Sequence, residues 1–338
     1  MAASTDDSVV LTGCGWVTPF AAGSIATVLA AAPSICHWNA TDEGYWAVSE
    51  DVLADTPVLS KELKSNKGAG MTAVALEHAR LEARLCPESV PPQRVGLVLG
   101  CALAGQIGMI DFADEVRDQT ARFVSPIHFP QTVGNYIAGA LARGYDIRGP
   151  NATIAGGVAS GLDALIQACR LLRGDEADVV FAGGTDSVSR SLALGLNELD
   201  PGSPRFSEGA CLFVLERAAD AGTRAVAPLA TVTNSGHAAG DDTVVARAPD
   251  SIVSTAGIRR SGAILIEHWV GRCFAALGAA AVAAAIGAAT GAPVPRAADA
   301  QSVSIETIRC PTPTKAAIIA DADGAHATTL ELSVTSGT

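Results

Sequence analysis

Basic and aromatic side chains are scarce in this sequence of 338 residues. Lysine and arginine number 23 against 35 aspartates and glutamates, which gives a formal net charge of −12. Because such a surface repels phosphate, the sequence argues against a nucleic-acid partner and against an anionic membrane. Aromatic residues make up only 4% of the chain, and alanine and glycine take their place. This composition predicts closely packed helices, or a surface that another subunit covers.

Cysteines with metal or redox spacing are also missing. The eight cysteines are scattered without a C-x-x-C pair, and the N-terminus does not resemble a secretory leader. We therefore expect separate thiols in a reducing, cytoplasmic environment, with no disulfide framework and no metal site.

One long stretch, residues 273–295, carries no charge at all. It consists mainly of alanine and glycine, and Pro293 and Pro295 interrupt its end. Because alanine gains little from transfer into lipid, the stretch predicts a buried core helix and not a membrane span.

Short apolar runs alternate with helical patterns along the first half of the chain. The runs at 95–99, 152–154 and 179–181 predict buried strands, and the spacing of residues 162–173 predicts an amphipathic helix that ends before Gly174. In the second half we expect strands at 229–233, 264–266, 303–305 and 316–319, with a polar loop region over 234–262. This alternation is typical of a layered α/β protein.

The most informative segment is residues 149–165, where a strand runs into a small-residue turn and then into the predicted helix. Other segments of the same character are Val9 to Pro19, Ala182 to Ser187 and Ser207 to Ala210. Together they resemble the ketosynthase family of the thiolase fold, over about residues 8–217. The run from Gly161 to Leu165, with Thr185 to Ser187, is most similar to the family's non-catalytic subunit, the chain-length factor.

The resemblance implies an α/β thiolase-like fold in which two similar halves pack as layers in the order αβαβα. Residues 1–220 would form an N-terminal ketosynthase-like half, and residues 221–338 a shortened C-terminal half of the same integrated unit. It also implies a dimer interface at residues 129–135 and 152–155.

The resemblance further implies that the reactive groups of a condensing enzyme are absent. Val158 stands where the family has its acyl-accepting cysteine, and chain-length factors often carry glutamine there. Arg272 stands at the second catalytic histidine, Glu267 at a lysine, and no loop resembles the one that carries the first histidine. Asp321 and Asp323 stand where the family has two gating phenylalanines. We interpret His268 and His326 as structural, and we expect no catalytic residue and no cofactor.

A stripe on one face of a predicted helix carries residues that could shape a substrate tunnel without taking part in catalysis. Gln106, Met109 and Ala113 fall on one face of a predicted helix, and a similar helix in chain-length factors lines the substrate tunnel. The resemblance makes these three the candidate tunnel residues. The alternative is that the stripe is an ordinary buried helix face, and the sequence leaves both possibilities open.

The resulting hypothesis is a chain-length factor that pairs with an active ketosynthase and shapes its acyl tunnel during elongation from malonyl units on acyl carrier protein. The carrier would dock mainly on the partner, because this chain is itself acidic. The shortened second half and the lack of glutamine at residue 158 favour polyene products. Alternatives are a homodimeric scaffold, a decayed paralogue, or an enzyme of another class such as a serine hydrolase that uses Ser160.

Overall fold

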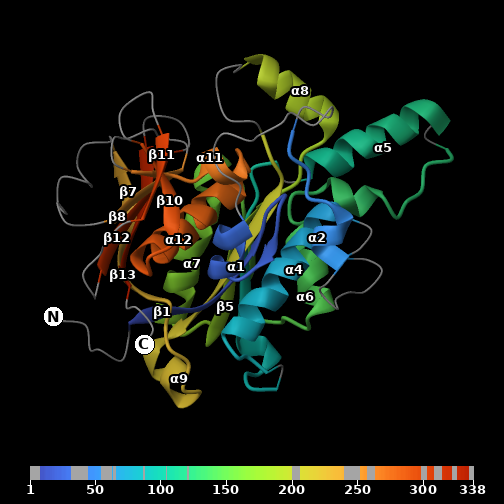
Figure 1. Cartoon of the computed structure of the whole chain (residues 1–338). Coiled ribbons are helices and arrows are strands. Elements are labelled where there is room, and N and C mark those ends of the chain that lie inside the picture. Colours follow the sequence, from blue (N-terminus) through green and yellow to red (C-terminus); the bar gives the residue numbers. More distant parts are fainter. Residues whose placement is uncertain are drawn as a thin grey trace.

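The computed structural model of the chain describes residues 8–31, 45–54, 63, 66–86, 88–103, 105–119, 122–199, 206–239, 252–256, 263–297, 303–307, 314–321 and 326–334. The described elements form an α/β protein, as the sequence predicts (Figure 1).

The first half of the chain builds one side of the sheet. Its strands lie in the order β4-β3-β5-β6-β1, with β3 parallel to both β4 and β5 and with β6 antiparallel to both β5 and β1. A short β2 pairs with the end of β1. The bounds are β1 (Val9–Val17), β2 (Ala22–Gly23), β3 (Val95–Gly100), β4 (Asn151–Ile154), β5 (Val179–Asp186) and β6 (Gly209–Arg217).

The second half of the chain continues this sheet in the order β7-β13-β12-β8-β9-β10-β11. The two parts join where Val10 and Leu11 of β1 pair with Thr231 and Ala230 of β7. The bounds are β7 (Ala230–Ala239), β8 (Ile252–Ala256), β9 (Ile264–Leu265), β10 (Pro293–Ala297), β11 (Val303–Thr307), β12 (Thr314–Asp321) and β13 (His326–Val334).

The predicted loop over residues 234–262 is wrong in part. β7 continues to Ala239, and residues 252–256 form β8. β7 pairs with β13 and β8 pairs with β12, so both strands are held by partners far away in the sequence. Polar residues such as Asn234 and Ser235 give no apolar alternation, which is why the local pattern did not indicate a strand.

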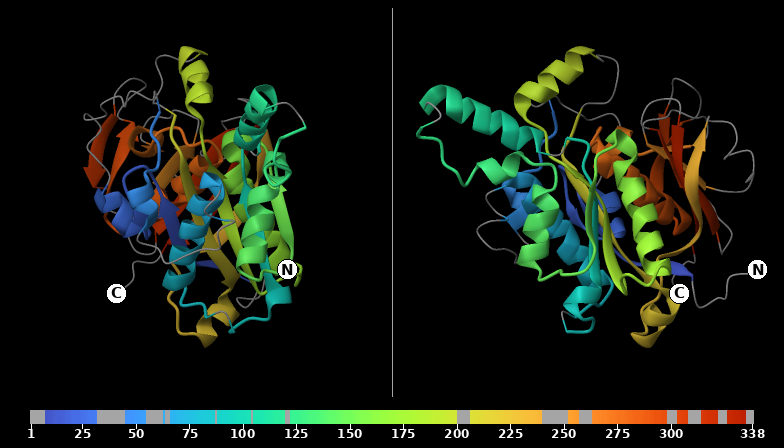
Figure 2. Two further views of the ribbon diagram at one scale, coloured as in Figure 1. Left: turned by 90° about the vertical axis from the view of Figure 1, so that its right-hand side faces the viewer. Right: turned by 180° about the vertical axis from the view of Figure 1, so that it is seen from behind.

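Two helices, α7 (Ser160–Arg173) and α12 (Ala275–Ala289), lie between the two parts of the sheet, and α4 (Lys67–Glu82) and α6 (Tyr136–Gly144) cover the outer face of the first part (Figures 1 and 2). The layers are therefore helix, sheet, helix and sheet; the fifth predicted layer lies outside the described residues. The remaining helices are α1 (Ile25–Ala31), α2 (Glu50–Ala54), α5 (Gln106–Gln119), α8 (Arg190–Leu199), α9 (Ala218–Thr223) and α11 (Glu267–Val270).

Strands β5 and β6 of the first half are buried on both faces. In β6, Cys211, Phe213 and Leu215 join the core around α7 and α12, whereas Leu212 and Val214 join the core beneath α4 and α6. This period of two is the expected geometry of a strand covered by helices on both sides. The core around α7 and α12 also takes in Ile318 and Leu330 of the second half. The predicted boundary at residue 220 falls within α9 and stays a prediction.

The uncharged stretch forms α12, whose residues are buried from Ala275 to Ala288. The prediction of a core helix is confirmed. In the part of the chain that the structure describes, no helix combines the length and the apolar character that a bilayer crossing requires.

Close packing of α12 explains why glycine and alanine replace aromatic residues. A Cβ atom on Gly161 of α7 would lie 2.2 Å from the Ala275 carbonyl oxygen, and one on Gly184 of β5 would lie 2.1 Å from the same oxygen. Both approaches are backbone to backbone, so a side chain at either position forces α12 away from its neighbours. The start of α12 is thereby fixed against the start of α7.

We predict that Gly161→Ala destabilises the chain by about 1–3 kcal/mol, because the added methyl group overlaps the backbone of α12. Denaturant unfolding of both proteins measures the change in the free energy of unfolding. Gly195→Ala in α8 is the matched control, since a Cβ atom there meets no atom within 4 Å. Equal effects of the two substitutions would contradict the packing described here.

Candidate vacant acyl site

The turn between β4 and α7 places Val158 beside the first turn of α12. Gly157, at a φ of 71°, reverses the chain, and residues 157–159 form a single 3-10 turn that leads into α7. Val158 packs against the central core, and a Cβ atom on Gly278 of α12 would lie 3.0 Å from the Val158 carbonyl oxygen. The N-terminal end of α7 is electropositive and would favour a thiolate, but the side chain of Val158 carries only methyl groups.

Ser160 holds this turn closed. Its Oγ accepts a hydrogen bond from the Gly156 N–H at 2.7 Å and donates one to the Gly157 carbonyl oxygen at 2.8 Å. The side chain is fully buried. Both of its hydrogen-bonding directions are used by the backbone, so the geometry assigns Ser160 to the shape of the turn and gives no support to a serine hydrolase.

Arg272 lies in the connection between α11 and α12, and its guanidinium sits 4.5 Å from the centroid of the Phe206 ring. Phe206 in turn stacks on Phe274, with ring centroids 5.1 Å apart. A cation over an aromatic face is a stabilising arrangement, and an arginine stays charged at all physiological pH values. The group at this position therefore cannot exchange a proton as an imidazole does.

Several residues singled out in the sequence lie outside the described part of the structure. These are the side chains of His268, Asp321 and His326, and the whole of Asp323. Glu267 is buried at the start of α11.

Two thiols beside the site could be taken for a displaced nucleophile. Cys101 follows β3 and Cys273 precedes α12, and both are buried. Burial raises the pKa of each thiol well above its usual range, and the Asp186 carboxylate raises both further. Since the thiolate is the reactive form, burial makes both cysteines poor nucleophiles at neutral pH.

We predict that iodoacetamide at neutral pH labels Cys86, which is exposed, at least about tenfold faster than Cys101 or Cys273. Peptide mass spectrometry of the native chain at several time points measures the three rates, and the same reaction in denaturant shows that all three thiols can be detected. Rapid native labelling of Cys101 or Cys273 would show that a reactive thiol remains at the site.

Asp186, at the end of β5, was noted in the sequence only as part of the run from Thr185 to Ser187, with no role of its own. Its buried carboxylate accepts three backbone hydrogen bonds, from the N–H groups of Ala102 at 2.9 Å, Leu103 at 2.8 Å and Ala275 at 2.8 Å. Burial raises the pKa of Asp186 to about 7, although the three donors act to lower it. The sequence could not predict this role, because the three hydrogen-bond donors come from two segments that are far from Asp186 along the chain.

The raised pKa has a consequence for stability. Because the native state holds the proton more tightly than the unfolded chain, the protonated group favours folding at acid pH, and this contribution is lost as the pH rises through about 7. We predict that the stability of the wild type relative to Asp186→Asn falls by on the order of 4 kcal/mol between about pH 4 and pH 8. Urea unfolding of both proteins across this range measures the difference, and a difference that does not change with pH would contradict the assignment.

An imidazole that the sequence analysis did not consider lies near the first turn of α7. The Nδ1 atom of His237 on β7 is 3.3 Å from the Thr328 hydroxyl, which donates to the Asp163 carboxylate at 2.9 Å. Asp163 belongs to the run from Gly161 to Leu165 noted in the sequence. His237 was not identified as a candidate, because residues 234–262 were predicted to form a loop. Its partners are polar groups of the fold and not the Val158 turn.

The candidate tunnel residues lie on α5. The structure excludes the alternative that they form an ordinary buried helix face. No residue of α5 is buried; Gln106 and Ala113 are exposed, and Met109 is 54% exposed. The stripe is therefore not an ordinary buried helix face of this chain. Its tunnel role stays a prediction.

Helix α5 and residues 122–135, here called the arm, project together from the body (Figures 1 and 2). The arm is held by Phe112 against Phe129, with ring centroids 5.7 Å apart, and by Glu115, whose carboxylate lies 2.8 Å from the His128 Nδ1 atom. Most of the large apolar side chains that lie exposed in the described residues are on it: Met109, Phe123, Ile127, Phe129 and Val133. Such a patch is typical of a protein-binding surface.

Strand β4 follows the arm and α6 in the sequence, and it is the last strand of the sheet within the described residues. It pairs with β3 on one side. Its side chains are exposed or half-buried, unlike those of β5 and β6. The predicted interface at residues 152–155 therefore falls on a sheet edge, where a further strand could pair.

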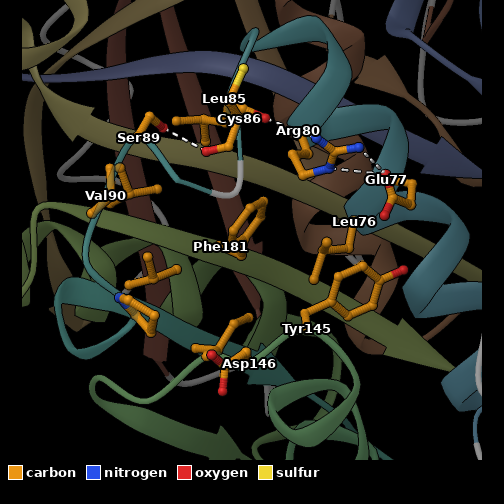
Figure 3. Close-up of a pocket in the computed structure, with 14 residues that line it drawn as sticks. Leu76, Glu77, Arg80, Leu85, Cys86, Ser89, Val90, Tyr145, Asp146 and Phe181 are labelled. Carbon is orange, nitrogen blue, oxygen red and sulfur yellow. Dashed lines mark hydrogen bonds and ion pairs between the residues drawn. The ribbon is translucent and has the colours of Figure 1, made fainter.

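A separate cavity of about 240 Å³ opens at the other end of β3 and β5, beneath the end of α4 (Figure 3). Its walls are mainly apolar, with Leu76 and Phe181 among them. Arg80 at its rim donates to Glu77 at 2.8 and 3.0 Å and to the Leu85 carbonyl oxygen at 2.9 Å. None of the described residues that line this cavity is a histidine, so it does not supply the acid–base groups of a condensation site.

The comparisons with known proteins agree with this geometry. Residues 65–221 match the family model described as "Beta-ketoacyl synthase, N-terminal domain". A 3-oxoacyl-[acyl-carrier-protein] synthase 2 of Rhizobium meliloti (strain 1021) is 33% identical over 114 residues, which are 33% of this chain and 27% of that protein. The chain thus spans about a quarter of the length of this curated relative.

Solved structures match almost the whole chain. A chain of the ishigamide ketosynthase/chain length factor superimposes with a TM-score of 0.76 at 15% identity, covering 97% of this chain and 99% of that chain. A second match is a chain from the structure described as "type II PKS acyl-carrier protein in complex with its ketosynthase bound to the hexaketide". Its TM-score is 0.74 at 16% identity, and it covers 97% of this chain and 99% of that chain. Residues 65–221 are therefore similar to the N-terminal domain of the β-ketoacyl synthases, and the chain has the thiolase-like fold of the ketosynthase structures that it matches, as predicted.

Proposed function

We propose that this chain is a non-catalytic chain-length factor that pairs with an active ketosynthase and shapes the acyl tunnel for polyketide elongation from malonyl units on acyl carrier protein. The observation that carries the proposal is the valine at residue 158, in a turn that is otherwise complete and closed by Ser160. A turn that had merely decayed would have no reason to keep its hydrogen bonds and its close contact with α12.

The arm supports the partner in this proposal. A ring contact and a hydrogen bond hold it together from within, yet five of its large apolar side chains are exposed. An active ketosynthase seated on the arm would bury this face and would bring its own cysteine and histidines to the tunnel. Acyl carrier protein, which is commonly acidic, would dock mainly on that partner, because this chain carries a net charge of −12.

The proposed products are polyene chains. The shortened second half and the absence of glutamine at residue 158 support this choice over aromatic polyketides. Met109 is adaptable and Ala113 is small, so the far end of a tunnel beside them stays open to a long chain.

The test is to co-express the chain with a ketosynthase encoded by a neighbouring gene and to assay elongation with the complex and with each subunit alone. The proposal predicts a mixed dimer, products from the complex, and no product from this chain alone. A stable self-dimer with no affinity for the ketosynthase would favour the homodimeric scaffold instead. Ile127→Asp on the arm should abolish co-purification, and Leu81→Asp, at an apolar position on α4 that is also exposed, should not.

We also predict that Met109→Trp or Ala113→Trp shortens the main product of the complex by one or more malonyl-derived units, because the larger side chain closes the tunnel earlier. Mass spectrometry of the extracted products measures chain length. The matched control is Leu81→Trp, which adds similar bulk to an exposed position on α4. Products of unchanged length from both α5 variants would remove these residues from the tunnel.

A further inference from the structure

Helix α5 has little packing of its own to fix its position. None of its side chains is buried, and its closest backbone contact is with the other side of the arm, where a Cβ atom on Gly108 would lie 2.3 Å from the Gln131 carbonyl oxygen. α5 and residues 129–132 therefore move as one body. The location of that body depends on how its base is attached to the rest of the chain.

The Asp186 carboxylate makes this attachment. Leu103 and Ala102 connect β3 to α5, and the Leu103 carbonyl oxygen accepts the hydrogen bond from the N–H of Gln106, the first residue of the helix. Oδ1 of Asp186 accepts from Leu103, while Oδ2 accepts from both Ala102 and Ala275. One carboxylate thus ties the base of α5 to the first residue of α12, the helix against which the Val158 turn is packed.

A second link between arm and body is weaker in kind. The Asn66 side-chain amide donates to the Gln131 side-chain oxygen at 3.2 Å, and both groups are neutral. Hydrogen bonds to an ionised carboxylate are shorter and about twice as strong as neutral ones. The charged link at the base is therefore the stronger of the two.

Stability does not account for this carboxylate. Burial disfavours its charged form and raises its pKa to about 7, so the ionised group is a cost to folding at neutral pH. The titratable groups that face it are the thiols of Cys101, from the end of β3, and Cys273, from the start of α12, and these thiols stay protonated. A buried charge kept at such a cost is explained by the position that its hydrogen bonds impose.

We infer that Asp186 is a positioning residue that sets where α5 begins relative to α12, and thereby sets the length of the tunnel in the proposed complex. This inference rests on the proposed function, because it concerns the helix that carries Met109 and Ala113.

Asp186→Asn removes one of the three hydrogen bonds and keeps the other two. An asparagine keeps one acceptor oxygen, which at the place of Oδ2 still accepts from Ala102 and Ala275, but its NH₂ group then faces the Leu103 N–H and repels it. The matched control is Glu216→Gln. Glu216 is also fully buried, and it accepts hydrogen bonds from Arg224 and Thr12, far from the arm in the sheet order.

The experiment measures two quantities on the co-expressed complex: amide hydrogen exchange of the peptide over residues 101–109, and product length. Asp186→Asn should raise exchange in that peptide about tenfold, the effect of losing one hydrogen bond to a charged group, and should change the product distribution. Glu216→Gln should change neither. Unaltered exchange in Asp186→Asn would overturn the inference.

The wild type gives an independent measurement that needs no substitution. Protonation of Asp186 turns one acceptor oxygen into a hydroxyl, so in local openings that leave Asp186 buried, the protection of residues 101–109, corrected for intrinsic exchange, should fall as the pH drops from about 8 to about 6. Protection that does not respond to pH would overturn the inference even if the asparagine variant fails to fold.

The outcomes also separate this inference from the proposed function. If Met109→Trp shortens the products and Asp186→Asn leaves them unchanged, the positioning role falls and the tunnel stands. If neither substitution affects product length, α5 does not line the tunnel, and the inference falls with it.

Discussion

The contact between the starts of α7 and α12 is the constraint on which the rest of the structure depends. Gly161 and Gly184 leave room for the Ala275 carbonyl oxygen, and the Val158 carbonyl oxygen lies against Gly278. In this way the two halves of the chain meet backbone to backbone beside the Val158 turn. The alanine- and glycine-rich composition follows from this contact, because bulkier residues would separate the helices.

In the proposed function, the chain keeps the scaffold of a condensation site without the side chains that carry out the condensation. The turn before α7 is closed by a buried serine, and the connection before α12 is fixed by a column of Arg272, Phe206 and Phe274. In the proposal, Val158 and Arg272 stand at the positions of the reactive groups, and a valine or arginine side chain can neither accept an acyl chain nor exchange a proton at neutral pH. What remains is shape: a rigid body from which an arm with an apolar face projects.

Local patterns predicted the parts of the fold that local sequence determines. The strands at β3, β4 and β5 and the helices α7 and α12 were predictable, because their apolar residues repeat with a strand or helix period. β7 and β8 were missed beyond residue 233, because strands held by distant partners need no apolar alternation of their own. The exposure of α5 was also beyond the sequence, since a helical stripe has the same pattern whether its own chain or another covers it. Asp186 was missed for a related reason: its three partners come from residues 102–103 and 275.

Acyl loading tests the central claim most directly. The purified complex is incubated with an acyl group carried on acyl carrier protein, and the intact mass of each subunit is then measured. The account predicts that the ketosynthase subunit gains the mass of one acyl group and that this chain gains none, because valine occupies residue 158 and the thiols beside it are buried. A covalent acyl adduct on this chain, mapped to the region of the Val158 turn or to Cys101 or Cys273, would contradict it.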